Sequence, residues 1–117
     1  IFHFYRENLE ILPSINMNPE PSGHVNGGWM PTIVFDRKSS VTREKLQSSF
    51  TSENIDARVF FWPLSSLPMF ESVSNNLNAY SIPDRAINLP SYHDMNDSDL
   101  NRILNVILTE LKKNRKK

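Results

Sequence analysis

The sequence predicts an α+β fold: a small, mainly antiparallel three-stranded sheet covered by helices. The chain has 117 residues, which is enough for one hydrophobic core but not for two. Apolar residues recur at helical spacing in three segments, and short runs rich in β-branched and aromatic residues separate them. The resulting order is helix, strand, helix, strand, strand, helix, which is typical of an α+β domain. The predicted elements are helix 1–12, loop 13–28, strand 29–36, helix 42–53, strand 56–62, loop 63–78, a turn or short helix 83–85, strand 86–90 and helix 96–111.

Turn-forming and capping residues justify the elements of the N-terminal half. Pro13 ends the first helix because proline lacks an N–H and its ring clashes with the preceding turn. The loop that follows is rich in proline, glycine and asparagine. Pro31 indicates that the next strand begins late or lies at an edge. Thr42 is a good N-cap with Glu44 in the first turn, and Asn54 closes that helix.

Strand alternation and helical spacing justify the elements of the C-terminal half. In the second strand, Val59 and Phe61 oppose Phe60 and Trp62. The long loop after this strand carries apolar side chains, so we expect it to pack against the domain. Asn96 is a good N-cap for the last helix, whose leucines and isoleucines repeat at helical spacing.

Charge is unevenly distributed along the chain. Thirteen basic residues balance thirteen acidic ones, but residues 1–111 carry eight basic and thirteen acidic residues, a net charge of −5. A negative body is a poor match for a phosphate backbone. No apolar run approaches the roughly 20 residues that span a bilayer. We therefore expect neither a nucleic-acid partner nor a membrane span. The remaining basic residues form a tail that we interpret as a solvated helix end, Lys112, Lys113, Arg115, Lys116 and Lys117.

A search for catalytic chemistry yields no motif. Three glycines cannot form a phosphate-binding loop, and the three histidines are isolated from one another. The sequence contains no cysteine, which excludes disulfides and thiolate ligands. Asp94, Asp97 and Asp99 are spaced like acidic metal ligands, but capping of the last helix explains them better. We expect no catalytic, cofactor-binding or metal-binding residue in this chain.

The aromatic run Phe60, Phe61 and Trp62 leaves two interpretations open. It could form a stacking platform for a base or nucleotide. Alternatively, a strand sends such side chains into the core, and we expect this for two of the three. Trp62 precedes the proline-containing loop, so it is the one expected to meet a ligand.

Residues 55–70 carry a resemblance to a known family. They read Ile-Asp-Ala-Arg-Val-Phe-Phe-Trp-Pro-Leu-Ser-Ser-Leu-Pro-Met-Phe. This run resembles the pattern Ile-x-x-Arg-x-Phe-Phe-Tyr-Pro-Leu-His-x-x-Pro-x-Tyr/Phe of the DegT/DnrJ-type sugar-nucleotide aminotransferases, especially their perosamine synthase branch. Further segments resemble motifs of the same family in the same order, at residues 5–9, 29–36, 42–50, 85–92 and 96–111.

The resemblance implies the C-terminal small domain of an enzyme built on the fold-type-I pyridoxal phosphate (PLP) scaffold. Residues 1–12 are then the helix leading in from a large domain, and residues 13–117 are the small domain. The parent would transfer an amino group from an amino acid, glutamate by family habit, to a keto sugar on a nucleotide, as in surface polysaccharide biosynthesis. The chain begins at Ile1 rather than methionine, which fits this expectation of a truncated chain.

The same resemblance implies where the cofactor and partners lie. The lysine and aspartate that hold PLP, and most phosphate contacts, belong to the family's large domain, so this chain alone is expected to be inactive. The parent is expected to be a cytoplasmic homodimer that binds a nucleotide sugar. Within this chain, Arg58, Trp62 and Ser65 are expected nearest to that substrate. Many family members carry histidine at the position of Ser65, where serine offers a weaker, uncharged contact.

A second interpretation is a free-standing α+β module that binds a small ligand without catalysis. In the first interpretation, a surface that faces the large domain remains uncovered in this chain. Two groups of apolar side chains are candidates for that surface, the stripe Phe2, Tyr5 and Leu9 on the first helix and the loop residues Leu64, Leu67, Met69 and Phe70.

Overall fold

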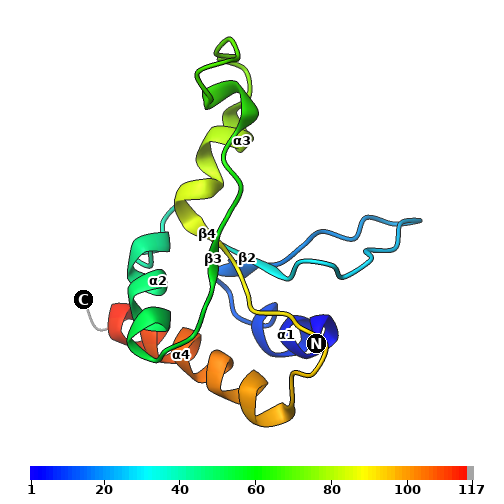
Figure 1. Cartoon of the computed structure of the whole chain (residues 1–117), viewed down its shortest axis with the longest axis vertical. Coiled ribbons are helices and arrows are strands. Elements are labelled where there is room, and N and C mark those ends of the chain that lie inside the picture. The colour runs from blue at the N-terminus through cyan, green and yellow to red at the C-terminus, as the bar shows by residue number, and fades with distance from the viewer. Residues whose placement is uncertain (116–117) are drawn as a thin grey trace.

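The computed structural model describes residues 1–115 and shows a four-stranded sheet flanked by helices (Figure 1). The sheet order is β1-β2-β4-β3, and every neighbouring pair is antiparallel. Helices, strands and two 3₁₀ turns follow the chain in this order: α1 (Phe2–Leu9), β1 (Ile15–Asn16), β2 (Thr32–Phe35), α2 (Arg43–Ser52), β3 (Arg58–Val59), η1 (Leu64–Ser66), α3 (Leu77–Ser81), η2 (Pro83–Arg85), β4 (Ala86–Asn88) and α4 (Asp97–Arg115).

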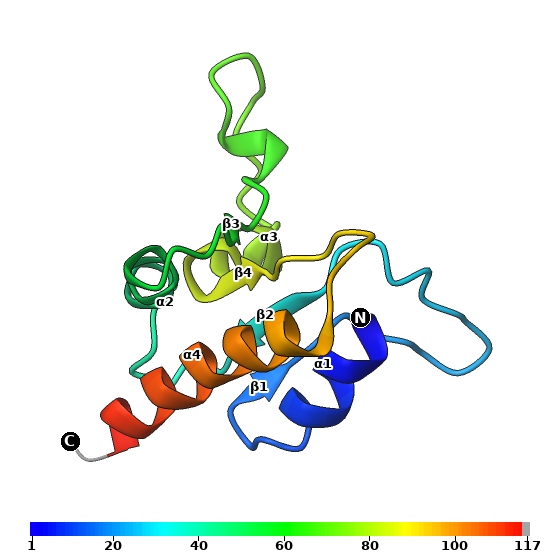
Figure 2. The same cartoon turned by 60° about the horizontal axis from the view of Figure 1, so that its bottom comes forward.

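The strand register gathers the large apolar side chains on one face of the sheet. Ile33 on β2 and Val59 on β3 both lie opposite Ile87 on β4, and Ile15 on β1 lies opposite Phe35. Because side chains alternate along a strand, these five share a face. Helices α1, α2 and α4 supply the side chains that pack with this face in one core, which include Tyr5, Leu9, Leu46, Phe50, Ile103 and Ile107 (Figure 2).

The predicted helix caps are confirmed. The hydroxyl of Thr42 accepts a hydrogen bond from the backbone N–H of Lys45 at 3.3 Å. Asn96 and Asp99 cap each other reciprocally, each side chain accepting from the other residue's N–H, at 3.0 and 3.4 Å. Asn54 ends α2 with a φ of 59°, a left-handed conformation that asparagine tolerates. Helix α4 continues to Arg115, beyond the predicted end at residue 111.

The predicted three-stranded sheet is wrong by one strand. The predicted loop 13–28 contains β1, a two-residue strand on the edge of the sheet. The predicted strand 29–36 begins at Thr32, as Pro31 suggested, so Trp29 precedes it and is 76% exposed. The predicted strand 56–62 shortens to Arg58–Val59.

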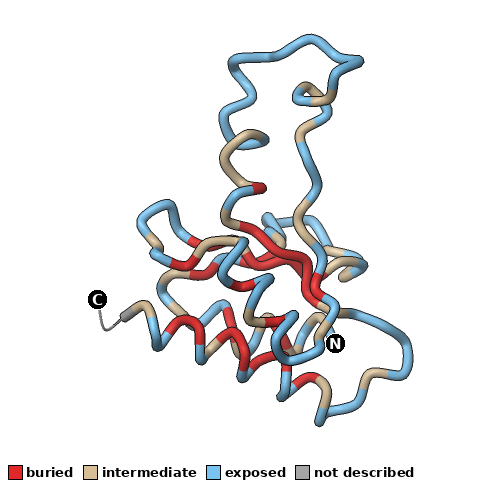
Figure 3. The backbone as a smooth tube through the Cα atoms, turned by 60° about the vertical axis from the view of Figure 1, so that its left-hand side comes forward, coloured by how far each residue is buried: buried red, intermediate tan, exposed pale blue. Residues whose placement is uncertain are grey.

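The expectation that loop 63–78 packs against the domain is also wrong. The chain leaves the sheet after Val59 and returns at η2, and the segment between projects away from the core, with most of its residues exposed and none buried (Figure 3). We call residues 60–82 the arm. Only Phe60 of the predicted aromatic run is half-buried, whereas Phe61 and Trp62 are exposed, so the expectation of two packed rings fails as well.

The apolar stripe of α1 is buried within the domain. Tyr5 and Leu9 are fully buried, and Phe2 is half-buried. The Tyr5 hydroxyl donates to the carbonyl of Pro90 at 2.8 Å, and burial raises the pKa of Tyr5 far above its usual value. Of the two surfaces proposed to face a large domain, only the loop segment is therefore open.

A second projecting segment precedes β2 and is ordered by polar contacts. Glu20 binds Nη1 of Arg6 at 2.5 Å and accepts from the N–H of Asn26 at 2.8 Å. Both contacts lower the pKa of Glu20, and the hydrogen bond from Asn26 contributes more than that from Arg6. Gly28 has a φ of +65° and a Cβ there would lie 3.2 Å from Cβ of Phe2, so glycine is required where this segment turns back toward the sheet.

The structure describes the basic tail as far as Arg115. Lys112 and Lys113 are exposed on the last turns of α4, in line with a solvated helix end. Lys116 and Lys117 lie outside the described residues.

Glu110 is a buried carboxylate that joins α4 to α2. Its Oε2 accepts from the Ser49 hydroxyl at 2.9 Å, and its Oε1 accepts from the Asn114 amide at 3.0 Å. Burial alone would raise the pKa of Glu110. The hydrogen bonds from Ser49 and Asn114 and the nearby Lys113 charge outweigh that effect, so the pKa is lowered.

We predict that the buried stripe of α4 is essential for stability. Leu104→Ala and Ile107→Ala each remove a buried side chain, and each is expected to lower the free energy of unfolding by about 2–5 kcal/mol. Urea unfolding followed by circular dichroism measures the change. Asn105→Ala, at an exposed site on the same helix, is the control and should change little. Equal effects at buried and exposed sites would contradict the assigned packing.

We predict that Glu110 makes stability depend on acidic pH. A carboxyl whose pKa is lower in the folded chain stabilises the fold above its ordinary pKa of 4.5, and this contribution disappears as pH falls through the folded value. The difference in unfolding free energy between the natural chain and Glu110→Gln should therefore shrink between about pH 6 and pH 3. Glu71→Gln, on the exposed arm, is the control. A difference that does not change with pH would show that the charge of Glu110 has no role.

Candidate functional site

A cleft of about 490 Å³ lies where the segment before β2, the segment around β3 and the start of α4 meet. Its floor includes Asn88 of β4, whose buried amide accepts from the Thr32 hydroxyl at 2.8 Å. Trp29 forms one wall and is mostly exposed. The cleft thus combines an aromatic ring with polar groups, which is the usual make-up of a small-molecule site.

The charged side chains of the cleft are balanced in sign. Nε and Nη2 of Arg58 donate to the Asp56 carboxylate at 3.1 and 2.9 Å, and both side chains are about three-quarters exposed. Arg102 donates to the carbonyl of Glu53. Asp99 accepts from the Tyr92 hydroxyl at 2.8 Å, and this hydrogen bond raises the pKa of Tyr92. The cleft therefore offers hydrogen-bonding groups without a strong net charge.

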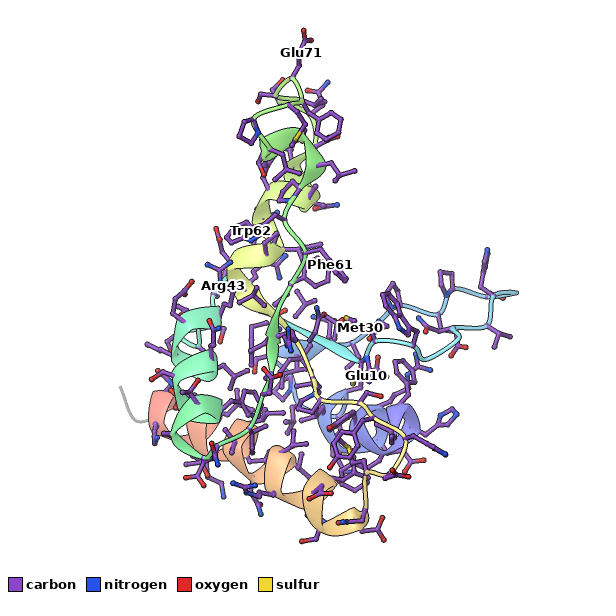
Figure 4. The ribbon with its side chains drawn as sticks, viewed as in Figure 1. Glu10, Met30, Arg43, Phe61, Trp62 and Glu71 are labelled. Atoms are coloured by element: carbon purple, nitrogen blue, oxygen red, sulfur yellow. The ribbon has the colours of Figure 1, made fainter. Side chains whose placement is uncertain are left out.

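Trp62 lies at the base of the arm, where Arg43 covers one face of its ring (Figure 4). The guanidinium carbon of Arg43 is 4.8 Å from the ring centroid, a cation–π distance. Nη1 of Arg43 also donates to the carbonyl of Pro83 at 3.2 Å, and the guanidinium pairs with Glu44 and Asp84. Arg43, the first residue of α2, thus holds both the outgoing and the returning chain of the arm.

Ser65 lies further out and bonds within the arm. Its hydroxyl oxygen is 2.6 Å from the hydroxyl oxygen of Tyr80. The Tyr80 hydroxyl also accepts from the backbone N–H of Val73 at 3.2 Å. The hydrogen bond with Ser65 contributes most to lowering the pKa of Tyr80, and the hydrogen bond from Val73 lowers it further. Tyr80 therefore connects three separate stretches of the arm.

An aromatic pair links the arm to the segment before β2. The rings of Trp29 and Phe61 stack with centroids 6.5 Å apart and planes inclined by 16°. Phe61 also makes an edge contact with Phe60, at 5.8 Å. The base of the arm is thereby connected to the cleft wall.

The three residues predicted to lie near a substrate do not meet in one site. Arg58 lines the cleft, whereas Trp62 and Ser65 lie on the arm and contact other arm or α2 residues. Sequence reasoning missed Arg43 and Tyr80, which are far in sequence from the residues they hold. Trp29 could have been found from sequence, as a large aromatic residue beside Pro31, which marks a late strand start.

Residues 1–115 show neither a metal cluster nor a membrane-spanning helix. They contain no group of three or more His, Asp or Glu side chains that could hold a metal ion. No helix among them is long and apolar enough to cross a membrane.

Residues 1–108 match the DegT/DnrJ/EryC1/StrS aminotransferase family. The chain belongs to this family. The matched range contains the cleft residues and the whole arm.

Two curated relatives of this family member illustrate the sequence likeness. The GDP-perosamine synthase of Vibrio cholerae is 32% identical over 112 residues, which cover 92% of this chain and 30% of that protein. The dTDP-4-amino-4,6-dideoxy-D-glucose transaminase of Escherichia coli is 29% identical over 114 residues, with coverage of 92% and 30%. This chain therefore spans about 30% of the length of the relatives that it matches.

Solved structures confirm the fold of the DegT/DnrJ/EryC1/StrS domain. The aminotransferase TlmJ from Streptoalloteichus hindustanus has a TM-score of 0.80 at 17% identity and covers 95% of this chain and 30% of that chain. DesI, solved in the presence of its TDP-sugar product, has a TM-score of 0.78 at 18% identity, with coverage of 97% and 30%.

We predict that Arg43 fixes the orientation of the arm. Arg43→Ala removes the cation–π contact and the bond to Pro83, together worth about 1–2 kcal/mol. Backbone amide exchange at residues 60–82 should accelerate roughly five- to thirtyfold, while the amides of α4 keep their rates.

Two control variants separate charge from shape in this experiment. Arg43→Lys keeps the charge but lacks the planar guanidinium, so it should also loosen the arm. Arg37→Ala removes an exposed charge from the turn before α2 and should have no effect. An arm whose exchange is unchanged in Arg43→Ala would show that the contact has no structural role.

Proposed function

We propose that this chain is the C-terminal small domain of a PLP-dependent aminotransferase that acts on a nucleotide sugar. The enzyme would transfer an amino group from an amino acid, with glutamate as the donor, to a keto sugar carried on the nucleotide, in the cytoplasm. The match of residues 1–108 to an aminotransferase family carries this proposal. The names of both curated relatives, one a GDP-perosamine synthase and the other a dTDP-amino-sugar transaminase, support the substrate class.

The described residues do not fit PLP. The cofactor, when bound, supplies an electron sink for amino transfer and needs a lysine in a pocket that favours its neutral form. Lys38, Lys45, Lys112 and Lys113 are all exposed, and none of these four lines the cleft. Helix α4 begins with acidic side chains, which disfavour a phosphate at its N-terminus. We therefore assign the cofactor to a large domain of a longer, homodimeric protein.

Within this chain, Arg58 is the strongest candidate for contact with the nucleotide sugar. Its Nε and Nη2 donate to Asp56. Among the described residues Nη1 has no hydrogen-bond partner, so it could donate to an anionic phosphate. Trp62 offers the ring face opposite Arg43, since just over half of the residue is exposed. Ser65 is the weakest of the three, because its hydroxyl is engaged by Tyr80.

The test combines the isolated chain with a chimera. The chain alone is expected neither to retain PLP through dialysis nor to transaminate, because no described lysine suits the cofactor. In the chimera, this chain replaces the matched stretch of the Escherichia coli dTDP-4-amino-4,6-dideoxy-D-glucose transaminase. The chimera should retain PLP and transfer an amino group from glutamate to dTDP-4-keto-6-deoxy-D-glucose, the ketone that corresponds to the amine in that relative's name.

Specific outcomes would overturn the proposal. Stable PLP on one lysine of the isolated chain, trapped by borohydride, would place the cofactor within these residues. A chimera that folds and holds PLP but transfers no amino group to a keto sugar nucleotide would remove the assigned reaction. If the isolated chain bound a small ligand tightly in the cleft without PLP, the free-standing binding module would be the better interpretation.

A further inference from the structure

An asparagine–glycine pair, Asn26 and Gly27, lies in the segment that projects from the domain ahead of β2 (Figure 1). Of the thirteen asparagines in the chain, Asn26 is the one that glycine follows. A glycine has no Cβ to shield its backbone nitrogen or to restrict rotation of its peptide. An asparagine in this setting is chemically labile, because the glycine nitrogen can attack the side-chain amide carbon of the preceding residue.

The fold leaves Asn26 open to this attack. Its Oδ1 accepts from the Gly28 N–H at 2.8 Å, a contact that stabilises the negative charge developing on this oxygen when the carbonyl is attacked. Among residues 1–115, Nδ2 of Asn26 has no hydrogen-bond partner to retain it as a leaving group. Gly27 is exposed, and a Cβ there would meet no atom within 4 Å, so its peptide has room to rotate toward the side chain.

We propose that Asn26 is a site of spontaneous covalent modification, at which the chain converts asparagine to isoaspartate and aspartate without an enzyme. The Gly27 nitrogen loses its proton and bonds to Cγ of Asn26. The bond from Cγ to Nδ2 then breaks, and ammonia leaves a five-membered succinimide. Water opens this ring at one of its two carbonyls, so the sum is asparagine plus water giving an acid plus ammonia, with no oxidation or reduction. The inference goes beyond the proposed function, since the reaction needs neither cofactor nor substrate.

The new carboxylate weakens the polar contacts that order this segment. Glu20 accepts from the Asn26 N–H at 2.8 Å and pairs with Arg6 at 2.5 Å. These contacts lower the pKa of Glu20, so its carboxylate is charged at neutral pH. Both products place a second negative charge beside it, and like charges at short range repel. Conversion therefore disfavours the bond between Glu20 and the backbone of residue 26.

Isoaspartate also changes the backbone itself. Its chain runs through the former side chain and contains one additional methylene, directly ahead of Gly28. At Gly28 the backbone approaches Phe2 so closely that a Cβ would lie 3.2 Å from Cβ of Phe2. The next residue is Trp29, the cleft wall whose ring stacks on Phe61. The longer backbone cannot keep both contacts, so conversion displaces this wall.

Peptide mass spectrometry of the chain, aged at neutral pH and physiological temperature, tests the reaction. We expect isoaspartate and aspartate to accumulate at residue 26 at least tenfold faster than at Asn75, which is exposed on the arm and precedes another asparagine. Gly27→Ala should slow the conversion at least fivefold, because a methyl group hinders attack by the adjacent nitrogen. Asn26→Gln, whose longer side chain must close a larger ring, should abolish it. Conversion at Asn26 that is no faster than at Asn75, or that Gly27→Ala does not slow, would overturn the proposal.

A peptide of residues 22–30 separates the effect of the fold from that of the sequence. It contains the asparagine–glycine pair but lacks the contacts with Arg6 and Phe2. Because the folded segment leaves Gly27 in open space, we expect the folded chain to convert at a rate within tenfold of that of the peptide. Stronger protection in the folded chain would show that the fold blocks the attack, and would overturn the assignment of Asn26 as a reactive site.

Nuclear magnetic resonance measures the effect on the cleft wall. The chain has two tryptophans and therefore two indole N–H signals, from Trp29 and Trp62. As the chain ages, we expect a second Trp29 signal to grow in proportion to isoaspartate, whereas Trp62, which Arg43 covers, keeps its single signal. Asn26→Asp has the new charge without the extra methylene, so it should shift the Trp29 signal less than isoaspartate does. A Trp29 signal that stays single while isoaspartate accumulates would overturn the link between this modification and the cleft.

Discussion

The central strand pair β2–β4 is the constraint on which the rest of the structure depends. Ile33 and Ile87 lie opposite each other and are fully buried, and on the other face the Thr32 hydroxyl donates to the Asn88 amide oxygen. The pairing fixes which face of the sheet meets the helices, because a slip by one residue would send every side chain to the opposite face. Strands β1 and β3 have two residues each and pair only with this centre.

The same pairing explains why the arm leaves the domain. β4 has three residues, and β3 uses the two at its C-terminal end, with Arg58 opposite Asn88 and Val59 opposite Ile87. The next pair would place Phe60 opposite Ala86, the first residue of β4, which directly follows η2. Beyond Phe60 the chain has no residue of β4 to pair with, so its backbone groups bond within local turns. The exposure of the aromatic run is thus a consequence of the register of a short central strand.

The parts of the fold that were predictable from sequence are those whose signals are local. Caps such as Thr42 and Asn96 sit next to the residues they bind, and the stripe of α4 repeats within one helix. The two-residue β1 was missed because two residues cannot show alternation, and its pairing with Phe35 spans a loop of turn-forming residues. Arg43 and Trp62 are far apart in sequence, and no periodic pattern indicates such a contact. In the candidate site, Arg58 was identified from a family motif, whereas the cleft around it required the fold.

The residue at position 65 decides whether this part of the arm carries a histidine. The family pattern favours histidine there, and a histidine changes charge between about pH 5 and 8. In this chain the serine hydroxyl is bound to Tyr80, and the arm contains no histidine, lysine or arginine. The Tyr80 hydroxyl is itself occupied by two partners within the arm. The arm thus lacks the imidazole that the family pattern has at this position. Its apolar surface depends on internal hydrogen bonds for its shape, and the charge that orders its base comes from Arg43 on α2.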